Sequence, residues 1–249
     1  MNWNDPLPTS SPAPLWFQIA ERLRAAIKRG KFKLGDALPS ESQINETFGV
    51  SRATSRASLD RLEHEGLIQR RSGKGSIVIA PRVDQPVTEM LGFAEDMRRR
   101  GLRPAHETRF AGSVKAPAEV ADALGVKAKS LVFQSRRLLK ADGAPIGFSE
   151  SWLAPSLFRN VDPPTVDDLN EGSLYEWLAR ECGVRPTGAR EFIEAAIVSD
   201  EMAGELQVPS HSAVLIARRL SRDSSGQPIE YAVLHFRPDR YRFHLEVKG

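Results

Sequence analysis

The sequence predicts an α+β protein with two domains, a small helical N-terminal domain and a larger C-terminal domain built on an antiparallel sheet. Short amphipathic helices separated by glycine-containing turns fill the chain as far as Gly66. After Gly66 the hydrophobic period changes from that of a helix to that of a strand. From Pro104 onward, extended runs alternate with short helices. That order is typical of an antiparallel sheet backed by helices.

Composition places the chain among globular proteins that carry no membrane segment. Its 249 residues are 41% hydrophobic and 27% charged, and they contain one cysteine, Cys182. We find no apolar run long enough to span a bilayer and no signal-like N-terminus, so we expect a cytoplasmic protein. Residues 1–80 hold 12 Lys and Arg against 8 Asp and Glu, while the remainder holds 23 against 24. The positive excess therefore lies in the first third, where a polyanion would bind.

The first elements are a lead-in and one amphipathic helix. Residues 1–13 are rich in proline and poor in apolar side chains, so we expect a disordered lead-in. A helix is predicted over 15–28, because Leu15, Ile19, Leu23 and Ile27 form a stripe at intervals of four. Gly30 follows it as a helix stop.

Two further helices are predicted around a tight turn. Ser40 and Gln43 form a capping box before a helix at 41–48, and Gly49 ends that helix. Ser51 then caps a helix in which Arg52 and Arg56 share one face. This is the pattern of a helix-turn-helix whose second helix reads the major groove of DNA. An ordinary helical corner with a solvated charge pair remains an alternative.

A basic hairpin follows these helices. Residues 67–71 and 76–79 read as strands, and the sequence between them contains Gly73, Lys74 and Gly75. Arg71 and Lys74 are suited to a phosphate or to the minor groove. A basic hairpin tip is by itself usually only solvated, but after a helix-turn-helix it reads as a wing.

Residues 14–80 resemble the winged-helix domain of the GntR family of regulators. The resemblance is carried by Pro14-Leu15-Trp16, Leu38-Pro39-Ser40-Glu41, Val50-Ser51-Arg52-x-Thr54-x-Arg56, Glu65-Gly66-Leu67-Ile68 and Gly73-Lys74-Gly75. It implies DNA contacts from Arg52, Thr54, Arg56 and Gly73. The predicted DNA-binding residues are Ser40, Ser51, Arg52, Ala53, Thr54, Arg56, Arg71, Gly73, Lys74 and Gly75. Ser55 departs from the family, which usually has Val or Leu there, and a buried hydroxyl needs a partner.

The remainder divides into a linker and one sheet domain. Residues 81–88 contain two prolines and no periodicity, so they are the predicted linker, with the second domain at 89–249. A helix is predicted from about 88 to 100, and a last strand at 241–247. Residues 118–150 and 199–236 repeat one order of helix, turn, arginine-bearing strand and hairpin. We expect two related halves that form one sheet.

The second domain resembles the UTRA ligand-sensing domain of HutC-type GntR regulators, which has the chorismate-lyase fold. The resemblance is carried by Glu95-x-Met97-x-x-x-Gly101, Arg137, Asp142-Gly143-x-Pro145-Ile146, Ser173-Leu174-Tyr175, Asp223-x-x-Gly226-x-Pro228-Ile229-Glu230 and Phe236-Arg237-x-Asp239-Arg240-Tyr241-x-Phe243. It implies an effector site, for which the predicted residues are Phe93, Arg137, Glu150, Ser173, Tyr175, Glu230 and Phe236. Arg137 as an internal ion-pair partner and Phe236 as a core residue remain alternatives.

Departures from the family pattern indicate the class of effector. Relatives that bind sugar phosphates use two arginines in an Arg-x-Arg strand, but here Leu139 follows Arg137. The usual glutamate of the next strand is replaced by Ser149, and Glu150 comes one residue later, on the opposite face. We therefore expect a carboxylate or amino-acid-like effector in preference to a sugar phosphate.

An enzyme is not expected. The histidines are scattered, no spacing suits zinc, and no nucleophile elbow or nucleotide-binding glycine loop is present. The sequence predicts no cofactor and no metal. A ligand-binding module that has lost DNA binding is the other alternative, and the retained arginines argue against it. The resulting expectation is a homodimeric repressor of a catabolic or uptake operon, which binds double-stranded DNA at a palindromic operator and is released by a small-molecule effector.

Overall fold

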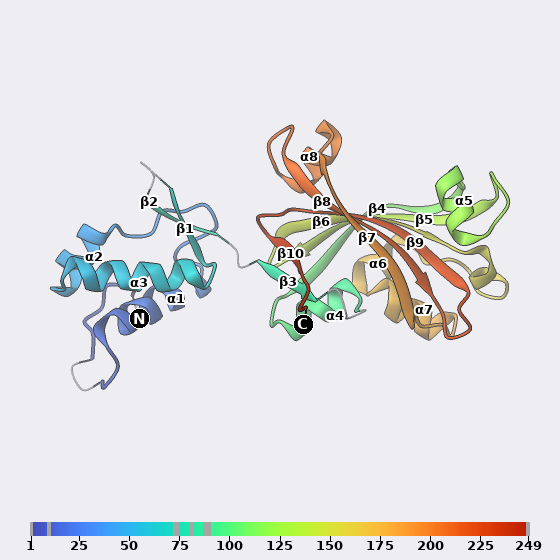
Figure 1. Ribbon diagram of the computed structural model, residues 1–249. Coiled ribbons are helices and arrows are strands. Elements are labelled where there is room, and N and C mark those ends of the chain that lie inside the picture. The colour runs from blue at the N-terminus through green and yellow to red at the C-terminus, as the bar shows by residue number, and fades with distance from the viewer. Residues whose placement is uncertain (1, 9–10, 72–74, 80–81, 87–90, 248–249) are drawn as a thin grey trace. The chain divides into compact units, whose positions relative to one another are not determined.

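The computed structural model describes residues 2–8, 11–71, 75–79, 82–86 and 91–247. They form two compact units, divided between Val83 and Asp84, and each is described by itself (Figure 1). None of the described helices is long and apolar enough to cross a membrane.

The N-terminal unit contains the three predicted helices and the predicted hairpin. They are α1 (Leu15–Lys28), α2 (Glu41–Phe48), α3 (Arg52–His64), β1 (Ile68–Arg71) and β2 (Gly75–Val78). The two strands are antiparallel, with Ile68 opposite Val78. Ile19 and Leu23 of α1 are fully buried against the apolar residues of α3. Leu15, the first residue of the predicted stripe, is half exposed.

Side-chain caps fix the turn between α2 and α3. The Ser40 hydroxyl accepts from the amide of Gln43 at 3.2 Å, and the Gln43 side chain accepts from the amide of Ser40 at 2.9 Å. Gly49 ends α2 with a φ of 63°, a conformation that favours glycine. Ser51 then caps α3 by accepting from the amide of Thr54. The helix-turn-helix is therefore specified locally.

Ser55 is fully buried on the inner face of α3. Its hydroxyl donates to the carbonyl of Arg52 at 3.1 Å, one turn earlier in the same helix. The hydroxyl therefore has its partner within α3, and a serine at this position leaves no orphaned polar group.

The lead-in differs from the sequence-based expectation of disorder. Trp3 packs on Phe32 and edge-on to Phe48, with ring centroids 6.4 Å and 6.1 Å apart. Arg22 of α1 donates to the carbonyl of Pro6 at 2.9 Å. One tryptophan that covers partly exposed aromatic rings is enough to hold a short proline-rich segment on the core, since the prolines reduce the entropy lost on ordering.

The predicted linker contains a strand. Residues Val83–Pro86 form β3, which pairs with β10 (Tyr241–His244) in a separate two-stranded sheet. Arg242 donates to the Asp84 carboxylate, and the Tyr241 hydroxyl donates to Gln85 at 3.2 Å. The strand predicted at 241–247 is present over Tyr241–His244, and it lies outside the main sheet. The following helix, α4 (Phe93–Arg99), is shorter than predicted, and residues 87–90 lie outside the described part of the chain.

The C-terminal unit is built on one six-stranded antiparallel sheet. Its strands are β4 (Pro104–Lys115), β5 (Leu131–Ala141), β6 (Ala144–Leu153), β7 (Gly188–Ile197), β8 (Ala213–Arg222) and β9 (Pro228–Phe236), in the order β4-β5-β6-β9-β8-β7. The order reads the same from both edges, with β6 and β9 at the centre. We call β4–β6 the first half-sheet and β7–β9 the second half-sheet. The prediction of two related halves in one sheet is confirmed.

Helices cover the two faces of this sheet (Figure 1). On one face lie α5 (Ala118–Leu124) and α8 (Asp200–Leu206), which follow the first strand of each half-sheet. On the other face lie α4, α6 (Val166–Glu171) and α7 (Leu174–Glu181), together with the short helix Pro155–Phe158 at its end. We call this the pocket face. Helix α6 was not predicted from the sequence.

Candidate functional site

The N-terminal end of α3 presents a polar, exposed edge. Ser51, Arg52, Ala53 and Arg56 are exposed and Thr54 is half-buried, while Leu59 and Leu62 pack into the core. Within the described residues, neither Arg52 nor Arg56 forms an ion pair. Guanidinium groups held on one edge of a helix, with their donors unused, are suited to base edges or phosphates.

Arg70 of β1 ties this helix to the hairpin. Its guanidinium lies 2.8 Å from the Asp60 carboxylate and donates to the carbonyl of Arg56 at 3.2 Å. The amide of Arg70 also donates to Glu63 at 3.0 Å. Arg70 therefore positions the wing against α3. Sequence reasoning missed this role, because it depends on carboxylates that lie seven or more residues away.

The structure describes only some of the predicted wing residues. Gly75 is exposed at the start of β2. Arg71 is the last residue of β1, but its side chain is not described, and Gly73 and Lys74 lie outside the described residues. Ser40 caps α2 and is exposed. Their contacts with DNA stay predictions.

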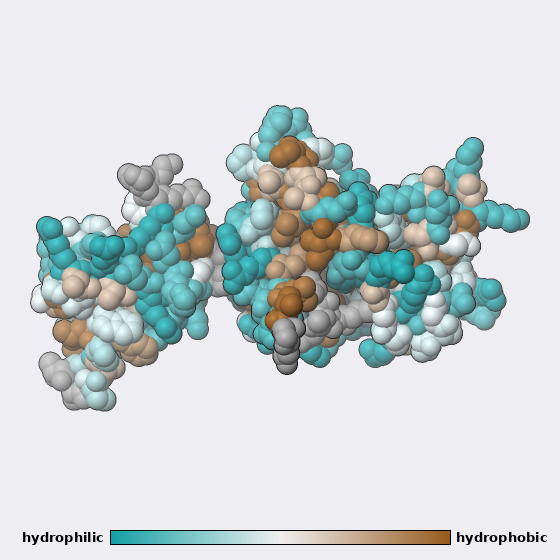
Figure 2. Space-filling model, viewed as in Figure 1, coloured by the Kyte–Doolittle hydropathy of each residue, from teal (hydrophilic) through white to brown (hydrophobic). Residues whose placement is uncertain are grey.

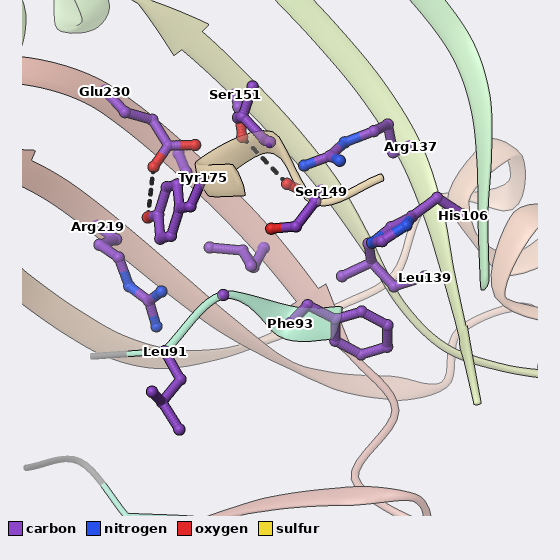
Figure 3. Close-up of a pocket in the computed structure, with 15 residues that line it drawn as sticks. Leu91, Phe93, His106, Arg137, Leu139, Ser149, Ser151, Tyr175, Arg219 and Glu230 are labelled. Atoms are coloured by element: carbon purple, nitrogen blue, oxygen red, sulfur yellow. Dashed lines mark hydrogen bonds between the residues drawn. The ribbon is translucent and has the colours of Figure 1, made fainter. Parts of the chain in front are cut away.

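A pocket opens on the pocket face of the C-terminal unit, between the sheet and the starts of α4 and α7 (Figure 3). It contains about 450 Å³ of space between atoms, part of it open to solvent. Both half-sheets contribute to its wall. The lining residues are Leu91, Gly92, Phe93, His106, Arg137, Leu139, Ser149, Ser151, Ser173, Leu174, Tyr175, Arg219, Glu230, Ala232 and Leu234.

Phe93, Arg137, Ser173, Tyr175 and Glu230 were predicted as effector residues, and the structure brings these five together in the pocket wall.

Glu150 and Phe236, the other two predicted residues, do not line it. Glu150 lies on the opposite face of β6 and pairs with Arg136 at 3.1 Å, because alternate residues of a strand face opposite sides. Phe236 is buried and stacks on Tyr241 at 3.9 Å. Gly147, opposite Phe236, leaves room for that ring, since a Cβ there would stand 2.7 Å from it.

Arg137 is a buried cation that forms no ion pair within the described residues. Its side chain is 6% exposed, and its Nε and Nη1 atoms have no hydrogen-bond partner within the described residues. Burial lowers the pKa of its guanidinium. A buried charge without a partner is costly, and the cost is recovered when an anion arrives. Within the described residues Arg137 forms no close ion pair, although the charge of Glu230 acts on it through space.

Arg219 occupies the equivalent place in the second half-sheet, and it is paired. Arg137 lies opposite Thr108 on its outer neighbour, whereas Arg219 lies opposite Glu191. The Arg219 guanidinium is 2.9 Å from the Glu191 carboxylate. Burial opposes its charge, but the nearby oxygens of Tyr175, Glu191 and Glu230 outweigh this and raise the pKa of Arg219. Arg219 was not predicted as a site residue.

His106 lies at the edge of the pocket beside Phe93, with ring centroids 5.7 Å apart. Burial, together with the charge of Arg137, lowers the pKa of His106 to about 3. The imidazole is therefore neutral at ordinary pH. Nothing in the sequence distinguishes His106 from the other scattered histidines. Its place on an edge strand beside Leu139 follows only from the register of the sheet.

Hydroxyl groups surround Glu230 at the other end of the pocket. Its carboxylate accepts from Tyr175 at 2.7 Å and from Ser221 at 3.2 Å. Burial and the neighbouring Glu230 raise the pKa of Tyr175, which stays protonated as a donor. Ser149 and Ser151 bond to each other at 3.2 Å on β6, between Arg137 and Glu230 (Figure 3).

These groups support recognition of a small polar ligand. The pocket offers one free guanidinium, several hydroxyls and apolar walls from Leu139 and Leu234. No group of three or more His, Cys, Asp or Glu in the described part of the chain could hold a metal ion.

A winged helix-turn-helix with unpaired arginines, joined to a unit with a polar pocket, defines a DNA-binding regulator with a ligand-sensing domain. Comparison with known proteins agrees with this. Residues 17–78 match the bacterial regulatory proteins of the gntR family, and residues 99–242 match the UTRA domain. The chain belongs to the GntR family, in the HutC-type branch that carries a UTRA domain.

Several relatives align over nearly the whole chain. The transcriptional regulator GgaR of Escherichia coli K12 is 31% identical over 98% of this chain and 95% of its own length. The transcriptional repressor NagR of Bacillus subtilis is 30% identical over 94% of each chain. The crystal structure of PhnF from Mycobacterium smegmatis superposes with a TM-score of 0.68 at 27% identity, over 91% of this chain and 99% of that one.

The protein is therefore a transcriptional regulator that binds DNA through its helix-turn-helix and senses a ligand through its UTRA domain. The domains and relatives that it matches form a non-enzymatic class.

Proposed function

We propose that the protein is a homodimeric repressor that leaves its operator when a small carboxylate or amino-acid-like effector enters the pocket. The observation that carries the effector class is the unpaired, buried Arg137. Its equivalent, Arg219, already holds the Glu191 carboxylate, which indicates the kind of group that this position accepts. An effector carboxylate at Arg137 would make the two halves electrostatically alike.

A carboxylate fits the pocket better than a phosphate does. A guanidinium binds a carboxylate through two parallel hydrogen bonds, and Arg137 supplies one such group. Leu139, one position further along the pocket face of β5, adds an apolar wall where a second cation would be needed for a doubly charged anion. Glu230 in the same wall adds repulsion against such an anion.

Homodimer formation is supported by the edge of the sheet. β7 is an edge strand, and Phe192, Ile193 and Ile197 on it are between 42% and 64% exposed. Figure 2 shows hydrophobic residues on the surface in the region where Figure 1 draws β7. An exposed apolar edge favours pairing with another chain. Two winged helices related by a two-fold axis would in turn favour a palindromic operator.

Repression is supported by one relative whose name states it, the transcriptional repressor NagR. For the effector to release the DNA, it must bind more tightly to the free dimer than to the DNA-bound dimer.

For the DNA contacts, we propose Arg52, Thr54 and Arg56 as the reading residues, supported by the exposure of both arginines and by the place of the half-buried Thr54 between them on α3. The test is fluorescence anisotropy with the DNA upstream of the protein's own gene. Arg52→Ala should weaken binding about 5- to 150-fold, which corresponds to roughly 1–3 kcal/mol. Arg61→Ala is the matched control, because Arg61 lies on the same helix but pairs with Glu65 at 2.5 Å. Equal effects of the two substitutions would refute the assigned reading edge.

The effector class is tested by thermal melting and by the same anisotropy assay. Simple carboxylates and amino acids should raise the melting temperature and release the DNA. Stronger stabilisation by a hexosamine phosphate would refute the carboxylate assignment.

A further inference from the structure

The pocket contains a second buried charged group, the carboxylate of Glu230. Glu230 is 3% exposed, and the hydrogen bonds described for its carboxylate come from the hydroxyls of Tyr175 and Ser221. Arg137 and Arg219 both act on it through space. Within the described residues, however, Glu230 forms no ion pair. A buried carboxylate usually has a cation close by.

Hydroxyl partners leave this carboxylate only partly compensated. Each hydroxyl satisfies a lone pair, but neither brings a positive charge, and the guanidinium of Arg219 is bound to Glu191. At the other end of the pocket, Arg137 forms no ion pair within the described residues. The pocket wall thus holds one positive and one negative group that influence each other through space without forming a close ion pair, with Ser149 and Ser151 between them (Figure 3).

The sheet register sets the separation of these two charges. Arg137 lies opposite Ser149, which lies opposite Leu234, four positions along β9 from Glu230. At about 3.3 Å per residue, that offset is roughly 13 Å along the strands. The long arginine and glutamate side chains close part of it, and both charges face the same pocket.

We propose that the effector carries a cationic amino group, bound by Glu230, in addition to the carboxylate bound by Arg137. The inference rests on the proposed function, since it assumes that the anion of the effector is at Arg137. The ligand is an amino acid whose two charged groups are separated by several bonds. Charge complementarity then accounts for both buried groups at once, and it gives the site specificity against plain acids and plain amines.

The experiment measures binding to the full-length protein by isothermal titration calorimetry. The probes are glycine and the ω-amino acids from 3-aminopropanoate to 6-aminohexanoate, with pentanoate and pentylamine as ligands that each lack one charge. We expect at least one ω-amino acid to bind at least about tenfold more tightly than glycine, pentanoate or pentylamine, since a lost charge-assisted contact is worth about that factor.

Two variants assign the charges. Glu230→Gln keeps one acceptor oxygen, which is enough for Tyr175 and Ser221 because both donate to the same oxygen of Glu230, but it removes the negative charge. It should therefore abolish the preference for the ω-amino acid over pentanoate. Pentanoate binding to this variant reports that the pocket is still folded. Glu150→Gln is the matched control on the opposite face of β6 and should leave the preference unchanged.

The outcomes separate this inference from the proposed function. Equal affinity for pentanoate and every ω-amino acid overturns the inference and leaves a carboxylate effector at Arg137. Tight ω-amino acid binding that survives Arg137→Leu overturns the proposed anion site. Failure of all acids and amino acids to bind overturns both. If Glu230→Gln does not fold, the comparison of probes on the unaltered protein still decides the result.

Discussion

The two half-sheets place an arginine at the same position and give it different surroundings. Arg137 of β5 lies between Thr108 and Ser149, and Arg219 of β8 lies between Glu191 and Ala232. In the second half-sheet the outer strand supplies a carboxylate, whereas in the first it supplies a threonine. The fold therefore gives Arg219 an internal anion, whereas Arg137 forms no ion pair within the described residues. In the function that we propose, this difference marks Arg137 as the residue that binds the effector carboxylate.

On the opposite face of the sheet, each half-sheet has an arginine that pairs with a covering helix. Arg136 of the first half-sheet pairs with Glu201 of α8 at 2.9 Å, and Arg218 of the second pairs with Glu119 of α5 at 3.2 Å. Each arginine reaches the helix of the other half. The cross-half ion pairs thus keep the symmetry that the arginines of the pocket face lose.

The largest expected effect comes from giving Arg137 the partner that Arg219 has. Thr108→Glu places a carboxylate opposite Arg137 and should reduce effector affinity about 100-fold or more, because the internal anion competes directly with the ligand. Titration calorimetry with the ω-amino acids and pentanoate measures it. Thr108→Val is the control, and it should change affinity by less than about threefold. Unchanged effector affinity in Thr108→Glu would contradict the inference that Arg137 differs from Arg219 because it lacks a neighbouring carboxylate.

The reverse change removes the internal partner. Glu191→Gln leaves Arg219 largely buried without its anion, so the free energy of unfolding should fall by about 2–3 kcal/mol, somewhat less than for a fully buried pair. Urea denaturation measures it. Glu194→Gln on the same strand loses an exposed pair with Arg218 and should cost about 0.5 kcal/mol or less. Equal costs would show that burial of the Arg219 pair contributes nothing.

His106 supplies a second asymmetry, since the equivalent position of β7 is Ala189. Its pKa is about 3 in the folded protein and near the ordinary 6.5 when unfolded. The unfolded chain therefore binds the proton first, and stability is lost as the pH falls from 6.5 toward 3.

Lowering the pH from 7.5 to 5 should accordingly cost the unaltered protein about 2 kcal/mol more than it costs His106→Ala. Urea denaturation at the two pH values gives the difference. Burial also lowers the pKa of His235, which is present in both proteins and cancels in this comparison. Identical pH dependence of the two proteins would contradict the burial of His106.

The smallest effects are expected where the halves are alike. Glu119→Gln and Glu201→Gln each remove one cross-half ion pair whose carboxylate is more than half exposed. Each should lower the free energy of unfolding by about 0.5 kcal/mol, and by similar amounts. A loss above about 1.5 kcal/mol in only one variant would show that the halves are joined unequally.

Local signals explain which parts of the fold could be predicted. The caps at Ser40 and Ser51 and the short helix Ala118–Leu124 depend on residues within one or two turns, and the structure has them where the sequence placed them. The resemblance to a family also located five pocket residues. The prediction of Glu150 as a pocket residue was wrong. Its displacement by one position, which is visible in the sequence, places its side chain on the opposite face of the sheet.

Other features depend on partners far away in the sequence. No residue close to Trp3 in the sequence indicates that it will pack on Phe48. No residue close to Asp84 indicates that Arg242 will donate a hydrogen bond to it. The sequence alone does not distinguish the pair Arg136-Arg137 from the pair Arg218-Arg219. Only the register with β4 and β7 shows that Glu191 neutralises one of them and that Thr108 leaves the other free.

The pairing of β3 with β10 has a consequence for biosynthesis. Tyr241 follows Pro86 by 155 positions, so β3 emerges from the ribosome long before the strand that completes it. At roughly 5–20 residues per second, the wait lasts about 8–30 s. The winged helix has all of its strands and helices by then. β3 therefore acquires its partner strand only after residues 241–244 have been translated.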